Sequence, residues 1–173
     1  NLDLTYQLRE TEKSPEHSTV IRWNENVGIA VDNVFSQIAN ITNLTFTKVI
    51  ENADIDFWLY SETDNILGYS YGIDGAGIFL NSHNIERSEI PLGGGDHVTI
   101  AHEIMHNLGM THPFDGYANF PDVTTAYDLG KLNSNQNIFT VTSYNDTGTK
   151  LENSLDINPE DPEQWLEFGM SNI

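Results

Sequence analysis

A chain of 173 residues with 7 Lys and Arg against 26 Asp and Glu has a net charge of −19, which repels phosphate backbones and anionic lipid and disfavours nucleic-acid and membrane partners. Leu, Ile, Val and Phe make up about 27% of the sequence, enough to fold around a core, but no apolar run approaches the roughly 18 residues that span a bilayer. The sequence has no cysteine, so disulfides, thiolate catalysis and cysteine metal ligands are excluded.

The first third of the chain predicts a strand followed by a helix. Residues 2–8 alternate loosely between apolar and polar side chains, as a half-buried strand does. Asn24 can cap a helix that fades near Asn40, because its apolar positions follow spacings of four, three and four. These positions are Val27, Val31, Val34 and Ile38.

Further strands and a second helix follow in the middle of the chain. Residues 44–51 and 55–60 are rich in β-branched and aromatic side chains, which favours two strands. Residues 67–71 predict a short edge strand between glycines, and residues 78–82 another strand. A glycine-rich loop then leads into a helix predicted over residues 97–108.

The last third of the chain is rich in turn-forming residues. We expect a long loop over residues 113–137, and loops of that length in a compact domain are usually functional. Residues 138–144 predict an apolar turn or short strand, and a capped helix should begin at Asp161. Because the chain begins at Asn1 without a leader or an initiator Met, we expect a mature or excised fragment. Its length of 173 residues predicts a single domain.

The strongest functional signal is an eleven-residue motif, His-Glu-Ile-Met-His-Asn-Leu-Gly-Met-Thr-His, over residues 102–112. On a helix, His102 and His106 project from the same face one turn apart and can bind one ion. Glu103 neighbours that face, where it can take a proton from water. Gly109 can end the helix with a positive φ, so that His112 supplies a third ligand. Three histidines with one open position are typical of catalytic rather than structural zinc.

At this motif the sequence resembles the metzincins, zinc endopeptidases that share the extended H-E-x-x-H-x-x-G-x-x-H pattern. Pro113, directly after His112, resembles the serralysin branch of that family. Three further segments are also similar to the sequence of a serralysin catalytic domain: Leu4-Thr5-Tyr6, residues 53–57 and residues 78–81. The resemblance covers roughly residues 2–145.

The resemblance implies an α+β fold, with a twisted, mostly parallel sheet, a backing helix and an active-site helix. Residues 1–109 would form an N-terminal subdomain, and residues 110–173 an irregular C-terminal one that could be truncated. It implies a secreted bacterial protein, monomeric, that acts on proteins or peptides, with Zn²⁺ as its cofactor and Ca²⁺ as a second candidate.

The same resemblance assigns roles to individual residues. Zinc would be held by His102, His106 and His112, and Glu103 would move the proton of the attacking water. Tyr144 would hydrogen-bond the oxyanion, although it could also be a plain core tyrosine. An extended substrate would bind along an edge strand, for which the candidates are Gly68, Tyr69, Ser70 and Tyr71. The competing interpretation of these four residues is a glycine-rich hairpin without a partner.

Two features depart from the family. Thr142 stands where the family has the methionine of a tight turn beneath the zinc, and a buried hydroxyl there must find a partner or lose stability. We therefore expect a weaker or less rigid zinc site, which Thr142→Met should improve. The glycine-rich calcium repeats of the family are also absent from the sequence.

The other histidines and one aspartate carry weaker signals. His97 is expected to be solvated or to lie near the metal ligands, and His17 and His83 to be isolated and exposed. Asp115 is expected to cap its loop, with orientation of the His112 ring as the alternative. The rival functions are a catalytically impaired, zinc-binding pseudoprotease or peptide-binding module of a larger secreted protein, and a structural zinc domain.

Overall fold

The computed structural model describes residues 2–10, 14–17, 20–72, 77–85, 90–116, 119–137 and 139–145. Contacts divide this part of the chain into two compact units, one up to Leu108 and one from Gly109 onward. The predicted C-terminal helix from Asp161 lies outside the described residues.

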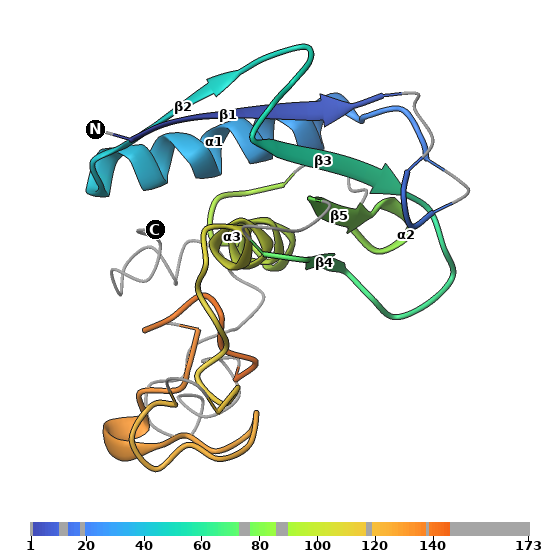
Figure 1. Ribbon diagram of the computed structural model, residues 1–173. Helices are drawn as coiled ribbons and strands as arrows, with labels where there is room; N and C mark the ends of the chain where they lie inside the picture. Colours follow the sequence, from blue (N-terminus) through green and yellow to red (C-terminus); the bar gives the residue numbers. More distant parts are fainter. Residues whose placement is uncertain are drawn as a thin grey trace. The chain divides into compact units, whose positions relative to one another are not determined.

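A five-stranded, mostly parallel sheet forms the first unit, as predicted (Figure 1). Its strands are β1 (Leu2–Arg9), β2 (Leu44–Lys48), β3 (Ile55–Tyr60), β4 (Gly68–Ser70) and β5 (Ile78–Asn81). Their order across the sheet is β2-β1-β3-β5-β4. The pairs β1–β2, β1–β3 and β3–β5 are parallel, whereas β4 runs antiparallel to β5 and forms one edge.

The two longer helices are α1 (Glu25–Ile41) and α3 (Gly95–Asn107), and α2 (Ser82–Ile85) is a single turn. Asn24 caps α1 as predicted, because its side chain accepts a hydrogen bond from the Asn26 N–H at 2.8 Å. The predicted apolar stripe of α1 is buried. The helix α3 begins two residues earlier than predicted, since Gly95 and Asp96 form its first turn.

The register of the strands shows that α1 and α3 cover the same face of the sheet. Leu8 pairs with Phe57, and Leu59 with Leu80, so these alternate residues share one face. Leu8 lies against Gly28 of α1, and Leu80 lies beside Gly68 and α3. No helix in the described part of the chain is long and apolar enough to cross a membrane.

The opposite face of the sheet carries an aromatic cluster. Trp58, Tyr60 and Phe79 are almost fully buried there, with Tyr69 packed beside them. His17 stacks on the Tyr60 ring with centroids 3.8 Å apart. The prediction that His17 is isolated and exposed is therefore wrong, because the aromatic rings offer its imidazole a partly buried place; His83 is exposed as predicted.

Side-chain hydrogen bonds to the backbone hold the second unit together, which is irregular apart from a 3₁₀ turn, η1 (Lys131–Asn133). Asn135 donates to the carbonyls of Asp128 and Ala126, and Asn145 donates to those of Ala126 and Asn135. Asp128 accepts hydrogen bonds from Thr124 and Thr125, which lower its pKa to about 2. Residues 139–145 form turns rather than a strand.

His97 is buried in the first turn of α3, so the solvated alternative is wrong, whereas a place near the metal ligands stays a prediction. Its side chain is 5% exposed, and its Nε2 has no hydrogen-bond partner in the described structure. Burial lowers the pKa of His97 below its ordinary value of 6.5, because the interior disfavours the charged ring. Protonation of His97 consequently favours the unfolded chain.

We expect His97 to make folding stability pH-dependent. As the pH falls through about 6.5, the unfolded chain binds the proton first, so stability drops by up to about 1.4 kcal/mol per pH unit. Chemical denaturation of the metal-free protein between pH 5 and 8 measures this loss. His97→Gln should lack it, whereas exposed His83→Gln should retain it; equal pH dependence of wild type and His97→Gln would contradict the explanation.

Candidate metal centre

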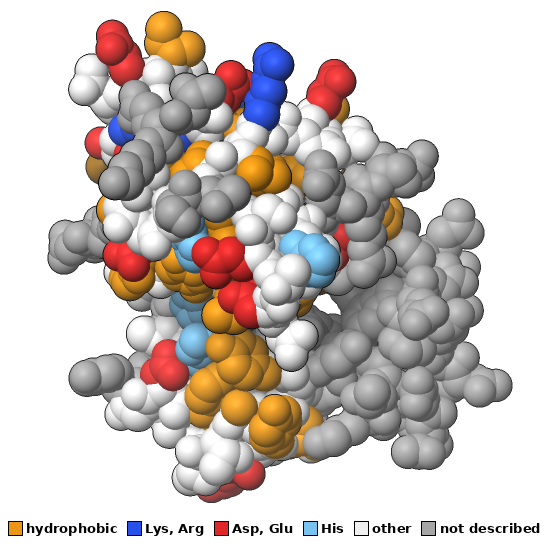
Figure 2. Space-filling view, turned by 90° about the vertical axis from the view of Figure 1, so that its right-hand side faces the viewer, with side chains coloured by type: hydrophobic (Ala, Val, Ile, Leu, Met, Phe, Trp, Pro, Cys, Tyr) orange, Lys and Arg blue, Asp and Glu red, His pale blue; other side chains and the backbone are white. Residues whose placement is uncertain are grey.

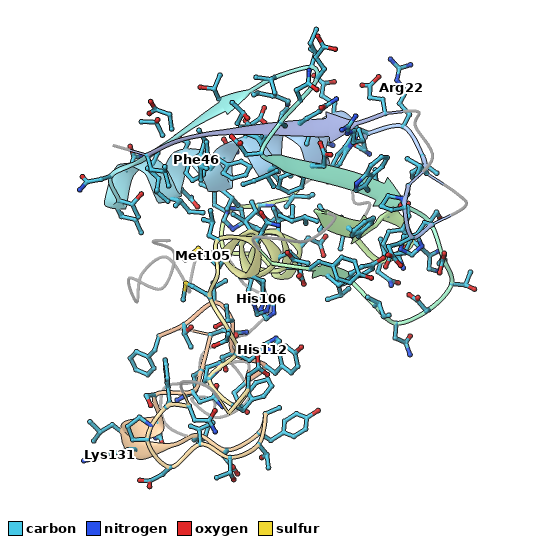
Figure 3. The ribbon with its side chains drawn as sticks, in the orientation of Figure 1. Arg22, Phe46, Met105, His106, His112 and Lys131 are labelled. Carbon is cyan, nitrogen blue, oxygen red and sulfur yellow. The ribbon has the colours of Figure 1, made fainter. Side chains whose placement is uncertain are left out.

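The helix α3 brings two of the predicted ligands together. His102 and His106 lie one turn apart, with their Nε2 atoms 2.9 Å from each other and their rings at 82°. Figure 3 labels His106 on α3. Two neutral imidazoles can share one proton at this distance, or both lone pairs can point at one cation. The helical spacing thus produces the pair without help from distant residues.

The helix α3 ends shortly before a glycine, which lies three residues ahead of the third histidine. The N–H of Leu108 donates to the Ile104 carbonyl, and Gly109 adopts a φ of 96°, which favours glycine. Three residues later the chain reaches His112. One ring nitrogen from each of His102, His106 and His112 lies within 4.8 Å of the others.

His112 is held from several sides within its own unit. Its Nδ1 lies 2.9 Å from the Asp115 carboxylate, which also accepts the His112 backbone N–H at 2.9 Å. Because a carboxylate only accepts, Nδ1 carries the proton and Nε2 keeps its lone pair. Asp115 therefore fills both of the roles considered for it, capping the loop and orienting the ring.

Aromatic rings complete the surroundings of His112. Phe114 stacks on the imidazole at 4.8 Å and 15°, and Tyr144 meets it edge-on at 4.7 Å. Phe114 and Tyr144 also contact each other, with centroids 5.1 Å apart. Tyr144 is 53% exposed, so the alternative of a plain core tyrosine is not supported. Sequence reasoning missed Phe114, because a phenylalanine is not a metal ligand and belongs to no metal-binding motif.

The donor set suits zinc. Two ligands at 2.0–2.1 Å from a tetrahedral ion lie about 3.3 Å apart, close to the 2.9 Å between the nitrogens of His102 and His106. Neutral imidazole is a preferred ligand of Zn²⁺, and Asp115 supplies the partner that metal-bound histidines usually have. Within the described residues this is the single group of three or more His, Asp or Glu placed to share an ion.

Glu103 lies next to the histidine pair but on the buried side of α3. Its side chain is 6% exposed, and burial raises its pKa to about 7. A carboxylate with such a pKa can accept and release a proton near neutral pH. The role of Glu103 as a general base stays a prediction.

The edge strand β4 lies directly against Glu103. A Cβ atom added to Gly68 would stand 3.2 Å from Glu103 Cγ and 3.0 Å from both the Phe79 carbonyl oxygen and Leu80 Cδ2. Only a residue without a side chain allows β4 to approach the helix this closely. The edge strand β4 and the Glu103 side chain are therefore in close proximity.

Asn107 ties the end of β4 to α3, a connection that sequence reasoning missed. Its side-chain amide donates to the Gly72 carbonyl at 3.1 Å and lies 3.4 Å from Ser70 Oγ. Asn107 is 5% exposed and directly follows His106. A polar residue on the buried face of α3 is the signal that could have revealed it.

Thr142 is buried, with an exposure of 1%, and its hydroxyl is fully partnered. Its Oγ1 donates to the Thr111 carbonyl at 3.1 Å and lies 3.0 Å from Thr140 Oγ1. Thr111 directly precedes His112, so Thr142 anchors the segment that carries the third histidine. The hydroxyl therefore has the partners that its burial requires, whereas the expected effect of Thr142 on the zinc site stays a prediction.

Comparison with known proteins gives a distant relationship. No family model matches the chain. The chain is similar to a serralysin of Proteus mirabilis, with 28% identity over 117 residues. That similarity covers 64% of the chain, but spans only 24% of the relative's length. It points to the same family that the histidine motif resembles, at the level of a weak relationship to zinc metalloproteases.

We expect Gly68→Ala to destabilise the protein. The added methyl group meets the Phe79 backbone oxygen at 3.0 Å, so β4 must shift away from β5 or from Glu103, at a cost of about 1–3 kcal/mol. Gly95→Ala is the matched control, because Gly95 opens α3 with nothing within 4 Å of a new Cβ. Thermal unfolding measures both variants, and an equally stable Gly68→Ala protein would show that the contact is not tight.

We expect Thr142→Val to lower the free energy of unfolding by about 1–2 kcal/mol, because the isosteric side chain loses both hydrogen bonds. Thr142→Met should also destabilise, which reverses the expectation drawn from the sequence. Urea denaturation of the two variants and the wild type measures the change. A Thr142→Met protein more stable than the wild type would restore the earlier expectation.

Proposed function

We propose that the protein is a zinc-dependent endopeptidase of the metzincin type, with His102, His106 and His112 as the zinc ligands. The observation that carries the proposal is the clustering of the three ring nitrogens within 4.8 Å, with Glu103 buried beside two of them. The similarity to a serralysin supports it. When bound at these nitrogens, zinc acts as a Lewis acid that lowers the pKa of water and polarises a carbonyl group.

Glu103 is the proposed general base. Its burial keeps the carboxylate out of bulk water and raises its pKa to about 7, so it can take a proton from the attacking water and pass it to the leaving amine. A structural zinc site would have no use for such a group. The retained Glu103 therefore favours an enzyme over a purely structural domain.

Tyr144 is the proposed donor to the oxyanion. It stands against the His112 ring at 4.7 Å and remains 53% exposed, so its hydroxyl can reach a ligand. A hydrogen bond to developing negative charge stabilises the transition state more than the ground state.

The edge strand β4 is the proposed binding strand for substrate. Its outer side has no neighbouring strand within the described sheet, and Gly68 places it against Glu103. An extended peptide can add to such an edge through main-chain hydrogen bonds. Tyr69, Ser70 and Tyr71, together with Gly68, would then contact the substrate.

The remaining features of the whole protein are proposals from the resemblance. They are secretion by a bacterium, action on protein or peptide substrates, a monomeric state and the two-subdomain division at residues 109 and 110. The net charge of −19 supports the expectation that nucleic acid and membranes are not partners.

We predict that Glu103→Gln lowers the rate of casein cleavage by about 10²–10⁴-fold, because the amide cannot accept the proton, while one zinc ion stays bound. Cleavage is followed by release of soluble peptides, and zinc by elemental analysis of the same samples. A chelator should stop the wild type and added zinc should restore it.

The outcomes separate the enzyme from its rival. Full activity of Glu103→Gln would contradict the proposed base. A wild type that binds zinc and peptide but cleaves nothing would favour a catalytically impaired binding module instead. Glu51→Gln, a change at an exposed residue outside the site, controls for the loss of one negative charge.

A further inference from the structure

The two faces of β4 present different surfaces to a bound peptide. Gly68 faces Glu103 and α3, so Tyr69, the next residue, faces the opposite side of the sheet. There the Tyr69 ring stacks on Phe79 at 4.8 Å, and Tyr71 meets both rings from the side. Alternate side chains of a strand added at this edge would therefore lie over tyrosine rings.

Each of these tyrosines is accompanied by a glutamate. Tyr69 shares its hydroxyl with His17 Nε2, and His17 Nδ1 lies 2.7 Å from Glu62. Tyr71 is 50% exposed, and its pKa is raised by burial and by the nearby charge of Glu16. Each tyrosine thus has a glutamate nearby, Glu62 reaching Tyr69 through His17 and Glu16 lying close to Tyr71.

The surroundings of these tyrosines are negative. Glu16 and Glu62 are both exposed, and Asp64 stands nearby, bound to Asn81. Red acidic side chains lie beside orange ones in the middle of Figure 2, whereas the blue Lys and Arg side chains of this view lie toward its top. Burial raises the pKa of Tyr69, and Glu16 and Glu62 raise it further, so the phenol stays neutral.

We propose that this edge selects extended peptides with lysine or arginine at alternate positions, each cation lying over one tyrosine and beside one glutamate. The inference rests on the proposed function, because it assumes that β4 binds the substrate strand. A cation over a tyrosine ring and an exposed ion pair each contribute modestly, so each matched position should strengthen binding about two- to fivefold.

The test compares two peptides of identical composition and charge. Both are unstructured ten-residue Gly/Ser peptides with two lysines, in one as Lys-Ser-Lys and in the other as Lys-Lys-Ser. General attraction to a protein of charge −19 is the same for both, but only the first places two lysines on one face of a strand. Affinity is measured by fluorescence anisotropy on zinc-loaded Glu103→Gln protein at pH 8.

We expect the Lys-Ser-Lys peptide to bind about two- to fivefold more tightly, and Glu62→Gln or Tyr71→Ala to make the two peptides equal. Glu51→Gln should leave the preference intact. Equal binding of both peptides by the parent protein, or no binding of either, overturns the inference. The proposed function is judged separately by zinc-dependent casein cleavage, so a failure of one is distinguishable from a failure of the other.

Discussion

The one-turn spacing of His102 and His106 on α3 is the constraint on which the candidate site depends. Two rings one turn apart on one helical face can meet a single ion through helix geometry alone, and the packing of the helix decides the orientation of the pair. The buried side of α3 fixes that orientation, because Ile100 and Ile104 are fully buried and Asn107 is bonded to the end of β4. The packing of α3 in the first unit therefore sets the direction in which the histidine pair faces.

The same packing of α3 also sets the pKa of Glu103, the residue that follows His102. Glu103 belongs to the buried stripe of α3, and the interior raises its pKa to about 7. Gly68 allows β4 to close over it. A substrate strand at this edge would thus lie beside Glu103, the proposed base, with its alternate side chains turned toward Tyr69 and Tyr71.

Local rules predicted much of the first unit. The cap at Asn24, the valine stripe of α1 and the apolar strands around Phe57 and Phe79 follow from spacing and residue type. The residues of the metal motif were found for the same reason, since eleven consecutive positions carry all of them. These features depend on neighbours in the sequence, and the structure brings His102, His106 and His112 together as their spacing predicts.

What the sequence could not predict depends on long-range partners. Asn107 is explained by Ser70 and Gly72, and Thr142 by Thr111, which lies 31 residues away. His17 is partly buried because it stacks on Tyr60 and hydrogen-bonds Tyr69, which lie on strands far along the chain. Side-chain bonds to the backbone shape the second unit, and such bonds have no periodic pattern to reveal them.

The central claim is that three histidines hold one zinc ion and leave a coordination position open. X-ray absorption spectroscopy of the zinc-loaded protein, with metal content measured on the same sample, tests it most directly. The account predicts one zinc per chain with three imidazole nitrogens at about 2.0–2.1 Å and no fourth protein ligand. Failure to bind zinc, or a closed shell of four protein ligands, would contradict it.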